Sequence, residues 1–364
     1  MKAGIVGLPN VGKSTLFNCL SNAKAQSANF PFCTIEPNIG VVNVPDPRLQ
    51  ALADCVQPEK VIPATVEIVD IAGLVRGASK GEGLGNQFLG NIRETDAILH
   101  VLRCFDDDNI VHVDGGVDPL RDKETIDIEL QLKDLETVEK RRDKIQRAAK
   151  TGNKEAQKEL DVLNTLCTGL EAAQNVRGLT FKEEDHEAFV APLQLLTDKP
   201  VLYICNVSEA DAATGNAYVE KVQAAIASEN AQLLVLAVSI EADINELETY
   251  EERQLFLSDL GLEEPGAAKL IRATYALLQQ QTYFTAGEKE VRAWTVTVGA
   301  TAPQAAGVIH TDFEKGFIRA EVISYDDYIQ FGTEAKVKEA GKMRVEGKEY
   351  VVDDGDVMHF RFNV

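Results

Sequence analysis

The sequence predicts an α/β fold of the P-loop NTPase type, a Ras-like G domain with a mostly parallel sheet. Three observations predict it. Residues 7–14 match G-x-x-x-x-G-K-[ST], the phosphate-binding loop. Strand and helix patterns alternate from the start of the chain, stop near residue 109 and resume at residue 200. From about residue 282 the pattern changes to alternating strands with a polar helix, which predicts a separate α+β domain.

Composition limits the class of protein. The chain has 364 residues and a formal net charge of −21, so we expect two or three domains and neither a nucleic-acid coat nor an anionic-membrane binder. Its six cysteines form no C-x-x-C pair, which favours a reducing compartment over a disulfide framework or zinc site. The P-loop strand begins almost at Met1, and no apolar run approaches about 18 residues. We therefore expect a cytoplasmic protein that does not enter a membrane.

The P-loop lies between an apolar strand, residues 3–6, and a helix that begins near Ser14. This arrangement collects backbone N–H groups and the positive end of a helix dipole around an anion. Lys13 is expected to reach the β- and γ-phosphates and Ser14 to ligate Mg²⁺. The nucleotide-binding residues predicted in the loop are Asn10, Val11, Gly12, Lys13, Ser14 and Thr15.

The strand predicted at residues 65–70 ends in D-x-x-G, with Asp70 and Gly73 at the two fixed positions. Asp70 is expected to hold Mg²⁺ through water, and the Gly73 amide to meet the γ-phosphate. Thr34, in the loop before the second strand, is a candidate to complete the Mg²⁺ shell; the alternative is an ordinary loop threonine. The glycine-rich residues 76–86 suit a second switch that orders on the triphosphate, or else a flexible surface loop.

A helical hairpin is predicted within residues 124–173, with its turn at residues 151–153. Apolar residues that step by three or four carry this prediction: Ile128, Leu132, Leu135, Val138, Leu160, Leu163, Leu166 and Leu170. The tip, residues 140–158, is basic in an otherwise acidic chain. It is a candidate contact for RNA phosphates, and a solvated helix surface is the alternative.

The remaining elements follow from apolar runs and alternation. Further strands are expected at residues 39–44, 97–104, 200–206, 233–239, 291–298, 316–323, 349–352 and 359–364. Further helices are expected at residues 266–279 and 325–330. His100, within one of these apolar runs, is expected to be a core or strand-end histidine.

The residues after the predicted strand at 200–206 bear on base selection. GTPases of this class have N-K-x-D there, whereas this chain has Val207 for the lysine and Glu209 for the aspartate, after Asn206. A site that loses its guanine-reading pair should lose much of its discrimination for guanine. We therefore predict that ATP is preferred over GTP.

The residue after Gly73 is Leu74, where Ras-like enzymes have a glutamine that orients the attacking water. Leucine cannot hydrogen-bond water, so either hydrolysis is slow or another group performs this task. The candidate is His112, whose pKa range suits water positioning or acid–base chemistry. The alternative is a loop histidine without a role.

With these motifs assembled, the chain resembles the YchF/Obg-like ATPase family over nearly its whole length. The most specific stretches are residues 4–17, 28–38, 70–74, 81–88 and 313–320. The resemblance implies a nucleotide domain at residues 1–122 and 197–280, a coiled-coil insertion at 123–196 and a ubiquitin-like TGS domain at 281–364.

The resemblance also implies an activity and partners. It implies ATP preference, a hydrophobic residue (Leu74) in place of the catalytic glutamine, and His112 as the substitute. Asn10 matches an asparagine that some relatives use to bind K⁺. The implied partner is the ribosome, with the large subunit and rRNA contacted through the hairpin and the TGS domain, in translation regulation or a stress response.

Three hypotheses remain open at this point. The first is a ribosome-associated Mg²⁺-dependent ATPase that works as a conformational switch. The second is a GTPase factor of translation or ribosome assembly, if Glu209 can still read guanine. The third is a recruitment protein whose hydrolysis is incidental. No exposed self-complementary seam is evident in the sequence, so we expect a monomer.

Overall fold

The computed structural model describes residues 1–22, 38–71, 73, 77, 84–113, 115–227, 229 and 231–363. The chain divides into two compact units. The first consists of Met1–Gly40 and Glu67–Leu270, and the second of Val41–Val66 and Ile271–Val364. Because each unit has its own core, the two are described separately.

The first sheet has six strands in the order β2-β4-β1-β5-β6-β7. They are β1 (Lys2–Val6), β2 (Ile39–Asn43), β4 (Thr65–Asp70), β5 (Ala97–Arg103), β6 (Val201–Asn206) and β7 (Gln232–Leu236). The β1–β4, β1–β5, β5–β6 and β6–β7 pairs are parallel, as predicted. Parallel strands have their carboxyl ends at one edge of the sheet, so the loops after β1, β4, β5 and β6 meet there.

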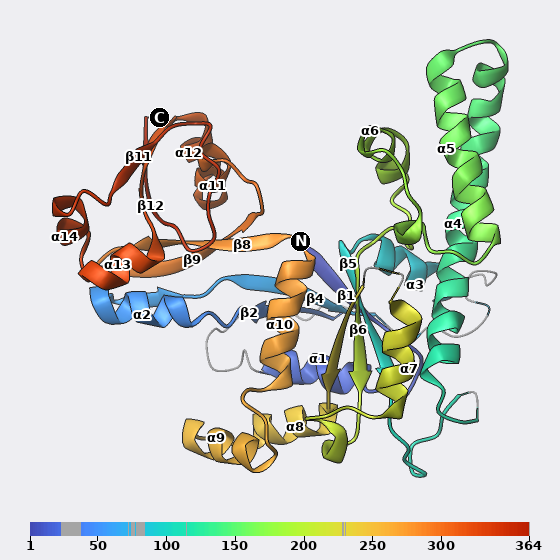
Figure 1. Ribbon diagram of the computed structural model, residues 1–364, viewed down its shortest axis with the longest axis horizontal. Helices are drawn as coiled ribbons and strands as arrows, with labels where there is room; N and C mark the ends of the chain where they lie inside the picture. The colour runs from blue at the N-terminus through green and yellow to red at the C-terminus, as the bar shows by residue number, and fades with distance from the viewer. Residues whose placement is uncertain are drawn as a thin grey trace. The chain divides into compact units, whose positions relative to one another are not determined.

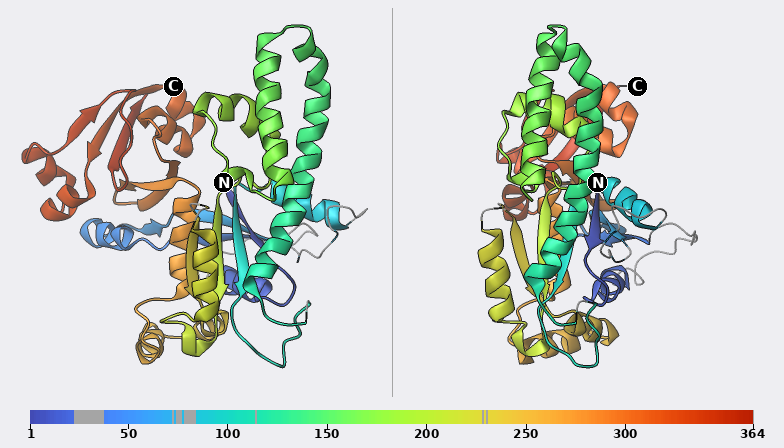
Figure 2. Two further views of the ribbon diagram at one scale, coloured as in Figure 1. Left: turned by 45° about the vertical axis from the view of Figure 1, so that its right-hand side comes forward. Right: turned by 90° about the vertical axis from the view of Figure 1, so that its right-hand side faces the viewer.

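Helices cover both faces of this sheet, and α1 and α7 lie on opposite faces (Figure 2). The helices of the unit outside the hairpin are α1 (Lys13–Asn22), α3 (Leu84–Arg93), α7 (Ala217–Ile226), α8 (Val238–Glu246) and α9 (Tyr250–Asp259). The division between the two units falls within α10 (Gly266–Leu277), after Leu270. Every residue of β5 and β6 is buried, which explains their nearly continuous apolar sequences. No helix in the described ranges is long and apolar enough to cross a membrane.

The predicted hairpin consists of α4 (Pro119–Lys150) and α5 (Lys154–Glu171), which extend together away from the sheet (Figure 1). Both helices have side-chain N-caps. The Asp118 carboxylate accepts hydrogen bonds from the first turn of α4, and the Asn153 side chain does the same for α5. Short helical turns then lead back to the sheet: Val176–Gly178, α6 (Glu183–Asp185), His186–Val190 and Ala191–Leu193.

The apolar pattern of the hairpin predicts burial correctly for only part of the two helices. Leu163, Leu166 and Leu170 of α5 are buried as predicted. In the first half of α4, however, Ile128 and Leu132 are 48% and 39% exposed. The buried positions of this half are mostly polar, together with Ile126 and Leu130, so the predicted apolar stripe lies on the wrong face of this part of α4.

The second unit has a six-stranded sheet in the order β11-β10-β12-β8-β9-β3. Its strands are β3 (Lys60–Ile62), β8 (Gln280–Ala286), β9 (Glu290–Thr297), β10 (Phe317–Ile323), β11 (Arg344–Glu346) and β12 (Val357–Phe362). Its helices are α2 (Pro47–Val56), α11 (Ala302–Ile309), α12 (Thr311–Lys315), α13 (Tyr325–Phe331) and α14 (Glu334–Glu339). The core between them contains Tyr283, Ala305, Val322 and Phe360.

A segment from early in the sequence completes this second sheet. Lys60–Ile62 pairs in parallel with Glu290–Arg292 of β9. On the same segment, the Arg48 guanidinium lies 2.8 Å from the Asp46 carboxylate and 2.8 Å from that of Asp354. Residues 41–66 therefore pack with the C-terminal unit although they precede most of the first unit. The domain boundaries at residues 122, 196 and 280 stay predictions.

Two expected strands differ from the structure. The strand predicted at residues 233–239 ends at Leu236, because Val238 begins α8 and donates its N–H to the Asn206 side chain. The residues predicted as a strand at 349–352 form only an isolated bridge between Val351 and Thr301. Their backbone groups bond the turn before α11, and the strand of this region is β11 instead.

Candidate functional site

The P-loop joins β1 to α1, and its glycines are required by close contacts. A Cβ on Gly7 would lie 2.6 Å from the Val101 carbonyl oxygen, and one on Gly12 would lie 2.6 Å from the Asn206 side-chain nitrogen. Gly12 has a φ of 101° and Asn10 a φ of 64°, so the loop turns through left-handed backbone twice. Glycine and asparagine are the residues that accept this conformation most readily.

Four predicted site residues lie together at the N-terminus of α1. The Lys13 ammonium, 7% exposed, donates to the Leu8 carbonyl at 2.6 Å. The Ser14 hydroxyl lies 3.4 Å from the Asp70 carboxylate. A Cβ on Gly73 would lie 3.2 Å from Lys13 Nζ, so the glycine passes directly beside the ammonium. A buried ammonium, a helix N-terminus and two oxygen donors fit a Mg²⁺–phosphate group.

Burial shifts the protonation equilibria of this cluster. Desolvation lowers the pKa of Lys13 to about 8, and the nearby Asp70 carboxylate opposes the change. Desolvation also raises the pKa of Asp70, with Lys13 and Ser14 acting in the opposite direction. Both shifts mean that the buried charges are incompletely compensated in the protein alone. An anion and a divalent cation bound together would compensate them.

Asn206 connects the P-loop to the predicted base-reading segment. Its side-chain amide donates to the Val11 carbonyl at 3.0 Å and accepts from the Val238 N–H at 3.0 Å. Val207 is buried and Glu209 is exposed. A cavity of about 670 Å³ extends between these segments. It is lined by Asn10, Gly12, Thr15, Phe105, Asp106, Asp107, Ile110, Asn206, Val207, Ser208, Glu209, Ala210, Val238 and Ser239.

His112 lies in the segment between β5 and α4. Its ring nitrogen Nε2 is 2.8 Å from the carboxylate of Asp122, and both side chains are almost fully buried. Burial raises the pKa of Asp122, and the hydrogen bond from His112 opposes this. One residue earlier, the Val111 carbonyl accepts a hydrogen bond from the Asn10 side chain at 3.1 Å. The structure thus brings the segment of His112 to the P-loop, and its catalytic role stays a prediction.

Two predicted positions, Thr34 and Leu74, lie outside the described residues. In the glycine-rich segment, Gly77 is described, and its N–H donates to the Glu129 carboxylate of α4 at 2.6 Å. Sequence reasoning identified neither Glu129 nor Asp122. Their only signal was an unusual density of charged residues on the first turns of a helix.

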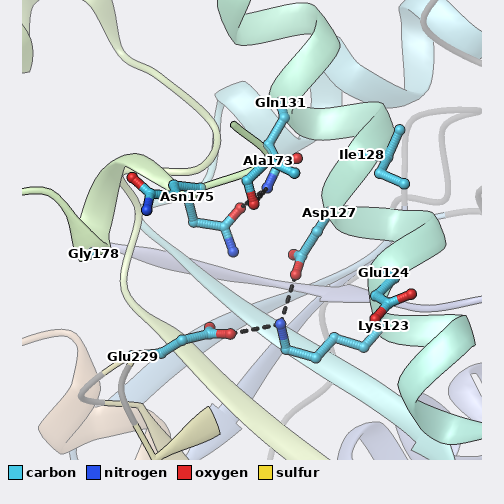
Figure 3. A pocket seen from close by; sticks show the side chains of 10 residues that line it. Lys123, Glu124, Asp127, Ile128, Gln131, Ala173, Asn175, Gly178 and Glu229 are labelled. Atoms are coloured by element: carbon cyan, nitrogen blue, oxygen red, sulfur yellow. Dashed lines mark hydrogen bonds and ion pairs between the residues drawn. The ribbon is translucent and has the colours of Figure 1, made fainter. Parts of the chain in front are cut away.

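A second pocket, of about 540 Å³, lies at the base of the hairpin (Figure 3). In it the Lys123 ammonium lies 2.7 Å from Asp127 and 2.6 Å from Glu229. Next to them, the Gln131 amide bonds Asn175 at 2.8 Å. Because these polar groups pair with one another, we interpret the pocket as a structural polar contact between α4 and the neighbouring segments of the first unit.

The basic tip is arranged differently. Four of its cations face carboxylates: Lys140 faces Glu136, Arg141 faces Glu159, Arg142 faces Glu139 and Lys158 faces Asp185. Four others have no carboxylate within 4 Å among the residues that have described positions, and all four are exposed. They are Lys144, Arg147, Lys150 and Lys154.

Comparison with known proteins identifies the family. A profile described as a 50S ribosome-binding GTPase matches residues 2–151. A second profile, YchF-GTPase_C, described as a protein of unknown function, matches residues 280–363. The protein of Haemophilus influenzae named ribosome-binding ATPase YchF is 60% identical over 363 residues, covering 100% of this chain and 99% of its own. The chain belongs to the YchF family.

Other members of the YchF family agree. The Bacillus subtilis protein with the same name is 56% identical over 366 residues and is covered over its full length. Among solved structures, the Schizosaccharomyces pombe YchF GTPase is 40% identical, with a TM-score of 0.89, and the match covers 99% of this chain and 97% of that one. The family resemblance and the P-loop fold predicted from sequence are thereby confirmed.

Proposed function

We propose that this chain is a ribosome-associated ATPase that uses Mg²⁺ and acts as a molecular switch in translation or in a stress response. The observation that carries the proposal is the cluster of Lys13, Ser14, Asp70 and Gly73 beside a cavity that continues to the predicted base-reading residues. The relatives named ribosome-binding ATPase YchF, similar over the full chain, support the same activity. Work at the ribosome would make it a cytoplasmic protein.

Adenine selection is proposed to arise from the segment that begins with Asn206. Guanine-specific relatives of the P-loop class use an aspartate there to accept from the guanine N1–H and 2-amino group. Here Glu209 is exposed and Val207 is buried in the cavity wall. Adenine has no 2-amino group and presents an acceptor at N1, so a site without that aspartate loses its preference for guanine.

The metal site is proposed to consist of Ser14, Asp70 and Thr34. Oxygen donors of this kind suit Mg²⁺, which, when bound, neutralises charge on the β- and γ-phosphates. Lys13 would orient the phosphates from its buried position, and Gly73 passes directly beside its ammonium. Asn10, at its left-handed turn of the loop, is the proposed K⁺ ligand.

Hydrolysis is proposed to depend on His112 because Leu74 cannot orient water. The Asp122 carboxylate lies 2.8 Å from Nε2 of His112, and both side chains are almost fully buried. This pairing fixes the ring and its tautomer. Replacing His112 by Ala should abolish turnover and leave nucleotide affinity within about twofold, because the proposed role is confined to the chemical step.

The proposed partner is the large ribosomal subunit, contacted as a monomer through rRNA by the basic tip and the C-terminal TGS domain. Lys144, Arg147, Lys150 and Lys154 are exposed at the tip. Phosphate contacts of this type need accessible cations and weaken with salt.

A GTP-dependent factor is the second candidate, because the similar fission-yeast protein is described as a GTPase. Calorimetric titration of ATP and GTP with Mg²⁺ separates the two. We expect ATP to bind at least about tenfold more tightly. The double variant Val207→Lys/Glu209→Asp restores the guanine-reading pattern and should shift the preference toward GTP. Tight GTP binding and weak ATP binding by the unmodified protein would reject the proposal.

A recruitment protein with incidental hydrolysis is the third candidate. Lys13→Ala should abolish nucleotide binding because it removes the only lysine of the P-loop. If nucleotide gates the protein, this variant should lose nucleotide-dependent ribosome association in a sedimentation assay. Unchanged association would favour recruitment over switching.

A further inference from the structure

Arg103 is a buried charged residue to which the proposed mechanism gives no role. It ends β5, in register with Asn206 on β6, and its side chain is only 2% exposed. The next residue, Cys104, donates its N–H to the Asn206 carbonyl at 2.8 Å. Arg103 therefore lies at the sheet edge where the P-loop and the base-reading segment meet.

The Arg103 guanidinium binds backbone rather than carboxylates. Its three nitrogens donate to the carbonyls of Phe105, Ile110 and Asp107 at 3.1, 2.9 and 3.1 Å. Its central carbon lies 4.8 Å from the centre of the Phe105 ring. Across the described ranges of the chain, no carboxylate oxygen lies within 4 Å of it. Its charge is balanced by three carbonyl dipoles, all from residues 105–110.

Four of the six residues 105–110 line the cavity proposed to bind the nucleotide. They are Phe105, Asp106, Asp107 and Ile110. The next residue, Val111, accepts the hydrogen bond from Asn10 of the P-loop. A side chain that fixes three carbonyls of this loop therefore fixes one wall of the cavity and its connection to the P-loop.

The loop of residues 105–110 depends on the Arg103 side chain because it has little regular structure of its own. It contains no helix or strand, and three aspartates follow one another at positions 106–108. Asp106 accepts from the Tyr218 hydroxyl at 3.1 Å and Asp107 accepts from the Asn109 N–H at 2.9 Å. Without Arg103, three carbonyls of this loop would lose their donor.

We infer that Arg103 is a positioning residue for the nucleotide site, which acts by holding the cavity wall formed by residues 105–110. The inference rests on the proposed nucleotide-binding function. Only a planar group with donors in several directions can bond these three carbonyls at once. A lysine keeps the charge but cannot keep this geometry.

The test compares Arg103→Lys with Arg177→Lys, a matched control in the same unit. The Arg177 side chain is 9% exposed, and it bonds the Thr197 carbonyl at 3.1 Å and faces Asp127 and Glu229, but it does not line the nucleotide cavity. For each variant we would measure the thermal unfolding midpoint, the dissociation constants of ADP and a non-hydrolysable ATP analogue, and KM and kcat for ATP.

We expect Arg103→Lys to weaken ADP and the ATP analogue together by about tenfold, the effect of roughly one lost hydrogen bond. KM should rise while kcat changes by less than about threefold, because the loop shapes binding rather than the chemical step. Arg177→Lys should lower the unfolding midpoint to a similar extent and leave both dissociation constants within about twofold.

Nucleotide affinity of Arg103→Lys within twofold of the unmodified protein would overturn the inference. If the lysine variant does not fold, Arg103→Gln avoids burying a poorly paired charge and should show the same loss of affinity. Failure of the unmodified protein to bind any nucleotide would instead reject the proposed function, so the two failures are distinguishable.

Discussion

The base and the tip of the α4–α5 hairpin are both rich in charge, but they use it in opposite ways. At the base, five charged residues of α4 are buried: Asp122, Lys123, Asp127, Glu129 and Asp134. At the tip, the basic residues are exposed except for the half-buried Arg142: Lys140, Arg141, Arg142, Lys144, Arg147, Lys150, Lys154 and Lys158. One continuous helix contains both kinds of surface.

This difference shows how a helix can be anchored at one end by buried charges and remain accessible to a partner at the other end. Three of these buried charges bond other segments of the first unit. The Asp122 carboxylate is hydrogen-bonded to His112, and the Glu129 carboxylate accepts a hydrogen bond from the Gly77 N–H. The Asp134 carboxylate accepts three hydrogen bonds from Leu196 and Thr197. Buried charges are costly to remove singly, whereas exposed charges contribute little to stability and remain free to meet a partner.

The largest effect on the unfolding free energy is expected at the base. Lys123→Met would leave Asp127 and Glu229 without the ammonium that lies 2.7 and 2.6 Å from them. Breaking a buried pair in this way costs about 3–5 kcal/mol. Urea unfolding measures the loss, with Lys144→Met at the exposed tip as the matched control. If Lys123→Met lowers the unfolding free energy by less than about 1 kcal/mol, the buried charges at the base do not stabilise the fold more than the exposed charges at the tip.

The contribution of Lys123 to the unfolding free energy should depend on pH in a defined direction. Burial lowers the pKa of Lys123, but Asp127, Tyr203 and Glu229 outweigh it, so the net shift is upward. A raised folded-state pKa means that the contribution is fully present below the unfolded-state pKa of about 10.4 and is lost only at higher pH. The stability difference between the unmodified protein and Lys123→Met should therefore stay constant from about pH 7 to 9. A decline within that range would contradict the assignment.

A smaller effect is expected for an ion pair near the tip. Arg141 lies 2.5 Å from Glu159, with side chains that are 46% and 9% exposed. Because solvent screens the arginine, the pair should contribute only about 0.2–1 kcal/mol. A double-mutant cycle with Arg141→Gln and Glu159→Gln measures this coupling. A coupling energy comparable to the loss in Lys123→Met would show that the pair belongs with the buried base.

Sequence reasoning succeeded where a function depends on adjacent residues. The P-loop, the D-x-x-G segment and the two-helix hairpin are local patterns, and the structure has the β1–α1 loop, Asp70 and the 151–153 turn in the expected places. Two features could not be predicted. Arg103 bonds a loop that has no pattern of its own, and Lys60–Ile62 pairs with β9, more than two hundred residues away. Such contacts depend on tertiary packing, which no local periodicity encodes.

The charge-dense start of α4 shows the same limit. Its apolar residues predicted a buried stripe through Ile128 and Leu132, yet both are exposed, and the buried positions are mostly polar, together with Ile126 and Leu130. A periodicity argument assumes that burial follows hydrophobicity. That assumption fails where paired charges, such as Lys123 and Asp127, make the contact.

The smallest effect on stability is expected from the four tip cations that have no carboxylate within 4 Å in the described structure: Lys144, Arg147, Lys150 and Lys154. Replacing all four by Gln should change the unfolding free energy by less than about 0.5 kcal/mol per site, because no folded-state partner is lost. If the tip contacts rRNA, ribosome affinity should nevertheless fall, and the slope of log K against log salt should decrease by about 3 to 4.

The matched control for this last variant replaces Glu124 and Glu139, two exposed or half-buried acidic residues of α4, by Gln. It changes charge on the same helix without removing cations, so it should not reduce the salt slope. An unchanged slope in the four-cation variant would mean that the tip is a solvated surface and that ribosome contact lies elsewhere. A reduced slope with unchanged stability would show that one helix separates anchoring from recognition, because the same type of side chain is structural where it is buried and available to a partner where it is exposed.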